Sequence, residues 1–176
     1  YEPSIIHRDS LIKEQLTADG VTASSQNGSL IWEPWENLKQ DGTPYKIFTP
    51  FYKYAIANNP PAAPNQSTNT NFDTVKCLQD KDRLDKLNLL PDINWYEQFA
   101  AHWQPGEKGA RQRLQDFTEN GLTDYREGRD YPAKRSVSML SPHLHFGEIS
   151  PREAATVVKQ AGDIDSNEEQ AAHFVR

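Results

Sequence analysis

Apolar residues recur at helical spacing most clearly between positions 107 and 122 of the chain. The apolar side chains share one side and the opposite side is charged, a pattern with a period of 3.6 residues. Glu107 stands in the first turn, and Gly121 follows the last periodic turn. These signals predict a helix over 107–120. Its core-facing side is expected to consist of Ala110, Leu114, Phe117 and Leu122.

Two serine-based capping boxes predict helices nearer the C-terminus. Ser150 is followed by Pro151 and Glu153, which favours a helix over 151–161 with Gly162 as its end. Ser166 and Glu169 form a second box before a short apolar stripe, which reaches Arg176 without a glycine or proline stop signal. We expect from this that the chain is a piece of a longer protein, the alternative being a short frayed terminal helix.

The N-terminal third carries weaker patterns. Asp9 or Ser10 is the predicted cap of a helix that Gly20 ends. Short strand-like pieces follow at 21–23 and 30–32, around a turn dipeptide. A helix followed by strands is typical of the tail of an α/β unit, and a small hairpin is the alternative.

Aromatic residues dominate the segment 41–56, where two prolines are expected to delay any helix until after Pro50. An aromatic stripe of this kind is more often core than a surface for stacking nucleobases. The next segment, 58–74, is rich in Asn, Pro, Ser and Thr, which predicts a linker or long loop. A further helix is expected from about Asn94, with one apolar face formed by Trp95, Phe99 and Trp103.

Composition narrows the class of protein. The 176 residues have a net charge of -6, so the whole chain is not a general nucleic-acid binder, and contact with DNA would need a local basic patch. Cys77 is the single cysteine, which excludes a disulfide within the chain and fits a reducing cytoplasm. No apolar run approaches the roughly 18 residues of a membrane-spanning helix.

A basic loop lies at 125–135, with four cations and two tyrosines. These cations could bind phosphate groups. The alternative is a solvated loop whose charges pair with Glu127 and Asp130, and such exposed pairs contribute little to stability.

A serine-rich turn follows at 136–141. Successive backbone N–H groups in a turn can bind an anion, and serine hydroxyls add further donors. The sequence lacks a glycine-rich phosphate-binding fingerprint, so a turn that caps its own backbone remains the alternative. His143 and His145 have no carboxylate or cysteine at a partner spacing, so no metal site is expected there. No catalytic set of nucleophile and base is recognisable.

Several motifs together resemble the DNA photolyase/cryptochrome family. They are "YREGRDYPA" and "LSPHLHFGEISPRE" in the C-terminal half, and "NGSLIWEPW", "DGTPYKIFTPFYK" and "LLPDINWYEQFAAHWQPGEKGARQRLQDF" before them. The resemblance implies a mixed fold, with the C-terminal part of an α/β (Rossmann-like) antenna domain, then a linker, then the first helices of an all-α FAD-binding domain. The implied boundaries are 1–57, 58–90 and 91–176.

The resemblance also implies roles for particular residues. Tyr125 matches a tyrosine that contacts the flavin cofactor, and Arg129 matches an arginine that contacts DNA phosphate. Glu2 aligns with a glutamate that holds a folate (methenyltetrahydrofolate) antenna in some members. The pentapeptide that wraps the FAD diphosphate, often Thr-Ser-x-Leu-Ser, is matched by Val137, Ser138, Met139, Leu140 and Ser141. Valine at the first position removes one hydroxyl donor, and a hydrogen bond to a charged group contributes about 1.5–3 kcal/mol.

The implied activity of the full-length protein is light-driven repair of cyclobutane pyrimidine dimers in DNA, by electron transfer from reduced FAD. A cryptochrome, a blue-light receptor without repair activity, is the alternative. A helical interaction module without cofactor would explain the helices but not the match over 125–141. We expect a cytoplasmic monomer that binds damaged DNA and no membrane, and we expect residues 1–176 alone to be inactive.

Overall fold

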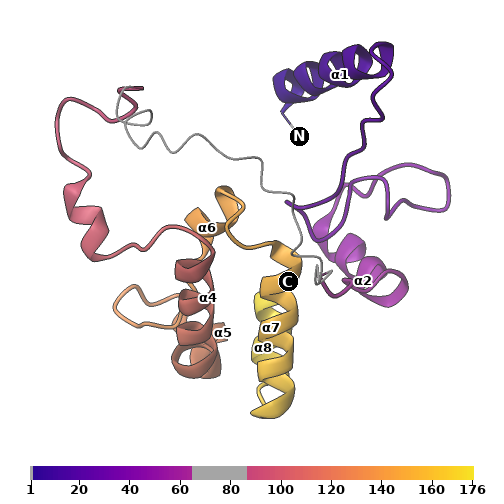
Figure 1. Ribbon diagram of the computed structural model, residues 1–176. Coiled ribbons are helices and arrows are strands. Elements are labelled where there is room, and N and C mark those ends of the chain that lie inside the picture. Colours follow the sequence, from indigo (N-terminus) through magenta and orange to yellow (C-terminus); the bar gives the residue numbers. More distant parts are fainter. Residues whose placement is uncertain (1, 65–86) are drawn as a thin grey trace, which may run out of the picture.

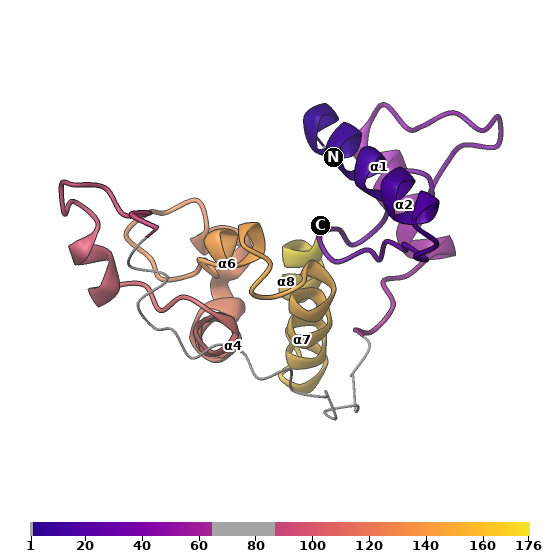
Figure 2. The ribbon, with the colours of Figure 1, turned by 45° about the horizontal axis from the view of Figure 1, so that its top comes forward.

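The computed structural model describes residues 2–64 and 87–176, and every named element in these ranges is a helix. In both views the helices α4 to α8 gather in one group, with α1 and α2 on the other side of the molecule (Figures 1 and 2). Much of the predicted linker 58–90, together with Cys77, lies outside the described residues. Arg152 connects the C-terminal group to the segment between α1 and α2, because its Nε donates to the carbonyl of Ile31 at 3.0 Å.

Helix α1 (Pro3–Ala18) begins earlier than the sequence predicted. Asp9 and Ser10 lie inside it and not at its start, because proline at the first helical position already begins the helix six residues upstream. Its end agrees with prediction: Gly20 has a φ of +78°, and Val21 N–H donates to the Leu16 carbonyl at 2.8 Å. No residue of α1 is buried.

The strand-like pieces at 21–23 and 30–32 do not form strands. The described residues contain one isolated antiparallel bridge, between Leu38 and Pro44, and no named strand. The α/β (Rossmann-like) part of the predicted fold is therefore not confirmed, whereas the helical part is. Two strand-like runs of three residues each cannot hold a strand by themselves, because a strand needs a neighbour to pair its backbone groups.

Helix α2 (Phe48–Asn58) contains Pro50 in its first turn, and so begins before that proline and not after it. A proline in the first turn has no intrahelical hydrogen bond to remove. Trp32 packs edge-on against Phe51 and Tyr52 at ring-centroid distances of 5.8 and 6.3 Å. Its indole Nε1 donates to the Asn59 carbonyl at 2.6 Å. The aromatic residues of 41–56 thus pack on one another in a local cluster, but none of them is buried, so the expectation that they form core is not confirmed.

The helix expected from Asn94 is reduced to the single 3-10 turn η1 (Glu97–Ala101). Trp95 and Phe99 are 61% and 59% exposed and pack on each other with ring centroids 5.7 Å apart. The spacing of these aromatic residues predicted a buried helical face, and that prediction is wrong within the described residues. The rings of Trp95 and Phe99 contact each other and are not part of the buried core cluster, whereas Trp103 stacks on the buried His143. Tertiary packing therefore does not extend a helix over Trp95 and Phe99.

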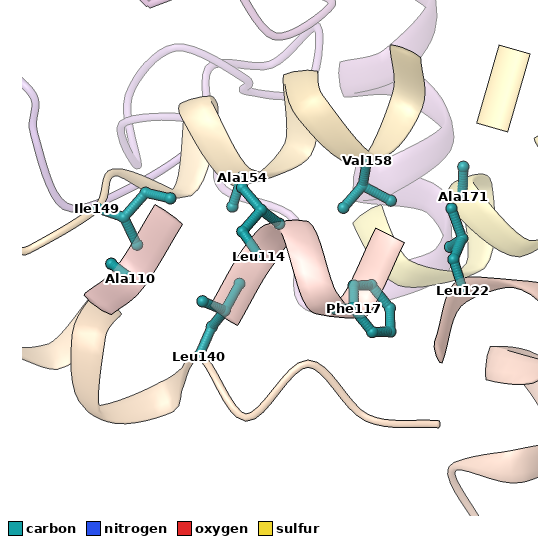
Figure 3. Close-up of a cluster of buried hydrophobic side chains, with 9 residues drawn as sticks. All are labelled: Ala110, Leu114, Phe117, Leu122, Leu140, Ile149, Ala154, Val158 and Ala171. Atoms are coloured by element: carbon teal, nitrogen blue, oxygen red, sulfur yellow. The ribbon is translucent and has the colours of Figure 1, made fainter. Parts of the chain in front are cut away.

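The predicted core helix is confirmed. It forms as α4 (Glu107–Asp116), continues as a π-helical turn η2 (Phe117–Gly121) and then as a 3-10 turn η3 (Leu122–Asp124). The four residues expected in the core are at most 3% exposed. They pack with residues of the following segments, as Figure 3 shows, namely Leu140, Ile149, Ala154, Val158 and Ala171. The π turn advances the chain by one residue relative to an α-helix, so it changes the direction in which the next side chains point.

Helix α7 (Pro151–Ile164) begins as predicted, with the Ser150 hydroxyl accepting from Glu153 N–H at 3.1 Å. Its predicted end is wrong, because Gly162 lies inside the helix. A Cβ on Gly162 would stand 2.6 Å from the Ala171 Cβ of α8 (Glu168–Val175), so this glycine permits close packing of two helices. The packing requirement explains a glycine that the sequence pattern marked as a stop signal.

The second capping box does not form. The N-cap residue of α8 is Asn167, and Ser166 has a φ of +55°. Asn167 N–H donates to the Gly162 carbonyl at 2.8 Å, which closes the end of α7. Ser166 therefore occupies the left-handed position that ends one helix, a place where glycine or asparagine is usual.

Candidate functional site

The serine-rich turn 136–141 is held at both ends by buried residues. Ser136 is 5% exposed and Leu140 is 1% exposed, whereas Val137 and Met139 between them are 41% and 55% exposed. The turn therefore presents its middle to solvent while its ends are fixed in the helical group. We call residues 137–141 the nest loop.

The backbone of the nest loop has the geometry of an anion-binding turn. Met139 has a φ of +54°, and Leu140 follows with φ -84° and ψ -8°, so a left-handed residue precedes a right-handed one. Successive residues of opposite hand direct their N–H groups to the same side of the chain. Within residues 2–64 and 87–176, the N–H groups of 137–140 donate no hydrogen bond. These donors are available to an external acceptor.

A left-handed methionine is a strained choice. For a residue with a Cβ this conformation costs about 1–2 kcal/mol, which the surrounding structure must hold in place. Two contacts do so. Leu140 belongs to the buried core, and Ser136 packs on Gly128, where an added Cβ would meet the serine Oγ at 2.2 Å. Strain that persists in an exposed turn suggests a functional requirement.

Helix α5 (Tyr125–Gly128) brings two of the predicted site residues together. The guanidinium of Arg129 lies 5.8 Å from the ring centroid of Tyr125. The same ring packs edge-on against Phe117 and Phe174 at 5.6 and 5.5 Å. The tyrosine is thus fixed on three sides by η2, α8 and the arginine, and the π turn upstream sets the direction of its helix.

The cations of the basic loop 125–135 are largely paired. Lys134 Nζ donates to the Asp124 carboxylate at 2.7 Å, and this hydrogen bond raises the pKa of the Lys134 ammonium. Arg126 forms an ion pair with Glu169 of α8. Arg129 lies 3.9 Å from Asp130 and keeps 41% of its side chain exposed. The pairing with Asp130 that the sequence offered as the alternative describes Arg129, whereas Lys134 and Arg126 pair with Asp124 and Glu169 instead. All three cations keep between 41% and 52% of their side chains exposed.

The two histidines occupy different surroundings on α6 (Ser141–His145). His143 is 1% exposed and its Nδ1 lies 2.5 Å from Glu148 Oε2, whereas His145 is exposed and packs edge-on against Phe146. The His143 hydrogen bond, followed by one from Gly106 N–H, lowers the pKa of the Glu148 carboxyl. The described residues hold no cluster of ligands suited to a metal ion.

Sequence reasoning did not identify Glu148 as a partner of His143. The available signal is Gly147, whose φ of +67° turns the chain back over α6. A Gly-Glu pair directly after a short helix places the glutamate beside the residue five positions earlier.

A cleft of about 1200 Å³ lies between α1 and the start of α7. It is lined by one side of α1, including Ile5 and Asp9, by residues 25–28, and by Arg152. Glu2 precedes α1 and is exposed, and it is not among the lining residues. Glu2, the predicted antenna contact, is thus close in sequence to residues that line the cleft but does not line it itself.

Comparisons with known proteins agree on one family. The family model described as DNA photolyase matches residues 1–67. A deoxyribodipyrimidine photo-lyase of Agrobacterium fabrum is 38% identical over 152 residues, which cover 86% of this chain and 32% of the relative. The crystal structure of a bacterial class III photolyase from Agrobacterium tumefaciens superposes with a TM-score of 0.85 at 33% identity, over 99% of this chain and 37% of the other. The chain belongs to the photolyase/cryptochrome family.

Both branches of the family are similar to this chain. Cryptochrome-1 of Arabidopsis thaliana is 31% identical over 169 residues, which cover 90% of this chain and 23% of the relative. The chain thus spans between about a quarter and a third of the length of these relatives. No helix in the described residues is long and apolar enough to cross a membrane.

Proposed function

We propose that the protein is a flavin-dependent photolyase that repairs cyclobutane pyrimidine dimers in DNA. The observation that carries this proposal is the nest loop, whose free N–H groups and strained Met139 suit a bound diphosphate. The fit is to the diphosphate of FAD, which Val137, Ser138, Met139, Leu140 and Ser141 would hold. When bound, FAD supplies light absorption and electron transfer to the dimer.

The chain's own residues provide binding and orientation. The N–H groups of the nest loop and the hydroxyls of Ser138 and Ser141 would donate hydrogen bonds to the diphosphate and fix its position. Val137 contributes its N–H without a hydroxyl, one donor fewer than the usual pentapeptide. The Tyr125 hydroxyl is the proposed second contact to the cofactor, and the packing of its ring on Phe117 and Phe174 supports a fixed side chain there.

Arg129 is the proposed contact to a DNA phosphate. It lies next to Tyr125 and keeps 41% of its side chain exposed. A contact of this kind fixes the register of the duplex and carries no sequence information. Its removal should weaken binding to damaged DNA and lower the salt dependence of that binding by about one phosphate contact.

The remaining assignments follow the same proposal. Residues 1–57 belong to the end of the antenna domain and the start of the interdomain region, 58–90 to the linker, and 91–176 to the start of the FAD-binding domain. Glu2 is a proposed contact to a folate antenna. The protein is proposed to be a cytoplasmic monomer.

Two measurements on the full-length protein test the proposal. Ser141→Ala should weaken FAD retention by up to about a hundredfold, the equivalent of one hydrogen bond to a charged group. A light-dependent repair assay should then show loss of dimers on illumination and none in the dark. FAD retention with illumination-dependent chemistry but no repair would support the cryptochrome alternative, which the similarity to cryptochrome-1 favours. Unchanged FAD retention in Ser141→Ala would contradict the nest assignment.

A further inference from the structure

His143 and Glu148 form a buried hydrogen-bonded pair directly after the nest loop. The histidine is 1% exposed, and 19% of the glutamate side chain is exposed. A carboxylate can only accept, so the His143 ring donates from Nδ1 over the 2.5 Å that separates it from Glu148 Oε2. A hydrogen bond with an ionised acceptor is about twice as strong as a neutral one.

The pair lies across the C-terminal end of helix α6. Glu148 N–H donates to the His143 carbonyl at 2.9 Å, and Gly147 N–H donates to the Leu144 carbonyl at 3.3 Å. With Gly147 in the left-handed conformation, this is a Schellman end. The two residues that usually make an apolar contact across such an end here make the side-chain hydrogen bond instead.

The same carboxylate also reaches a third segment. The backbone N–H of Gly106, at the start of α4, acts on this carboxylate and lowers its pKa after the His143 hydrogen bond. The Trp103 ring stacks on His143 with ring centroids 4.6 Å apart and planes inclined by 24°. Arg113 of α4 lies 5.5 Å above that tryptophan. One glutamate thus ties the segment 103–106 and α4 to α6.

Helix α6 continues directly from the nest loop. Ser141 is both the last residue of the loop and the first of the helix, and Leu144 N–H donates to the Leu140 carbonyl at 2.9 Å. Any rotation of α6 would therefore rotate the peptide planes at 139–141. The buried Leu140 side chain anchors the nest loop to the core. The His143–Glu148 hydrogen bond holds α6 in one orientation about its own axis.

We propose that His143 and Glu148 are positioning residues for anion binding by the nest loop, holding its N–H groups in one direction. This inference rests on the proposed function, in which the anion is the diphosphate of FAD. Neither side chain is proposed to touch the cofactor.

The test compares two flavins in the full-length apoprotein, FAD and riboflavin, which lacks the diphosphate. Glu148→Gln keeps the size of the side chain and removes its charge. It should weaken FAD binding, measured by flavin fluorescence, about tenfold, and leave riboflavin affinity unchanged. His143→Phe keeps the stack on Trp103 and should have the same effect, while His143→Gln, which keeps an N–H donor, should retain most of the FAD affinity. Glu168→Gln, an exposed position on α8, is the matched control and should change neither affinity.

Each other outcome overturns the inference in a distinguishable way. Equal weakening of FAD and riboflavin would mean a general structural role. Unchanged FAD affinity in Glu148→Gln, with weakening in Ser141→Ala, would remove the positioning role and leave the proposed function intact. Unchanged FAD affinity in both variants would contradict the nest assignment itself. If circular dichroism shows that Glu148→Gln does not fold, the FAD and riboflavin affinities of His143→Phe and His143→Gln provide the test instead.

Discussion

Helix α1 and the helical group α4–α8 differ in how their apolar residues are used. In α4–α8 the predicted apolar side is buried, with Leu114 3% exposed and Val158 0% exposed. In α1 the apolar residues stay on the surface, with Leu11 and Ile12 about half exposed. Both regions are helical, so the helical conformation by itself does not create a core. A core forms where another apolar surface packs against the helix, and α7 and α8 provide that surface for α4.

The comparison is tested most strongly by one substitution made in both regions. Leu114→Ala should lower the free energy of unfolding by about 2–5 kcal/mol, because it leaves a cavity in the core. Leu11→Ala should change it by less than about 0.5 kcal/mol, as expected for an exposed position away from special features. Urea unfolding of both variants, followed by circular dichroism, measures the difference.

Equal losses in the two variants would show that α1 packs on a core in solution. A small loss in Leu114→Ala, with a normal denaturant slope, would show instead that α4–α8 lack a fixed core. Either result would remove the contrast between the two regions.

Two serines with the same sequence signal give a second, smaller test. Ser150→Ala should lower the free energy of unfolding by about 0.5–2 kcal/mol, because Glu153 N–H loses its acceptor. Ser166→Gly should raise it by about 1 kcal/mol, because glycine adopts a φ of +55° without strain. Thermal and urea unfolding of the two variants check both directions.

The effect of substituting Ser166 on the unfolding free energy shows whether Ser166 is the N-cap of α8 or the left-handed residue that ends α7. If Ser166 were the N-cap that its sequence suggests, Ser166→Ala would cost as much as Ser150→Ala. In the structure its hydroxyl caps nothing among the described residues, so Ser166→Ala should be close to neutral.

The core of α4–α8 could be predicted from sequence because its signals are local and agree with one another. Helical periodicity, Glu107 and the Ser150 cap all point to the same elements. The misplaced ends lie at one place in the fold, since Gly162 permits close packing of α7 on α8 and Ser166 takes the left-handed position in the turn between them. A sequence pattern gives the local conformational preference of a glycine or serine. Whether that residue ends a helix or allows two helices to pack closely depends on the neighbouring helix.

The candidate site likewise has features that the sequence suggested and features that only the structure reveals. The proposed anion-binding role of 137–141 was suggested by the serines at 136, 138 and 141, and the family resemblance made that proposal specific. The left-handed Met139 was not predictable, because methionine carries no preference for that conformation. The His143–Glu148 pair was missed because no carboxylate stands at a regular helical or strand spacing from His143 in the sequence. Its partner becomes visible only once Gly147 turns the chain back.

The smallest expected effect is the pH dependence of the His143–Glu148 pair. The pKa of Glu148 is lowered in the folded protein, first by the His143 hydrogen bond and then by that of Gly106 N–H. The folded state therefore binds a proton at this carboxyl less readily than the unfolded state. Its contribution to stability is present above the ordinary glutamate pKa of 4.5 and is lost as the pH falls through the lower folded value.

Glu148→Gln has no carboxyl to titrate at this position, so the difference in unfolding free energy between wild type and variant should shrink below about pH 4.5. Urea unfolding at a series of pH values between about 6 and 3 measures this difference. His143→Phe should weaken the same dependence, because the largest cause of the lowered pKa is then gone. A difference that stays constant over this range would mean that the pair does not form in solution, and the tie between α4 and α6 would have to be sought in the packing of Trp103 alone.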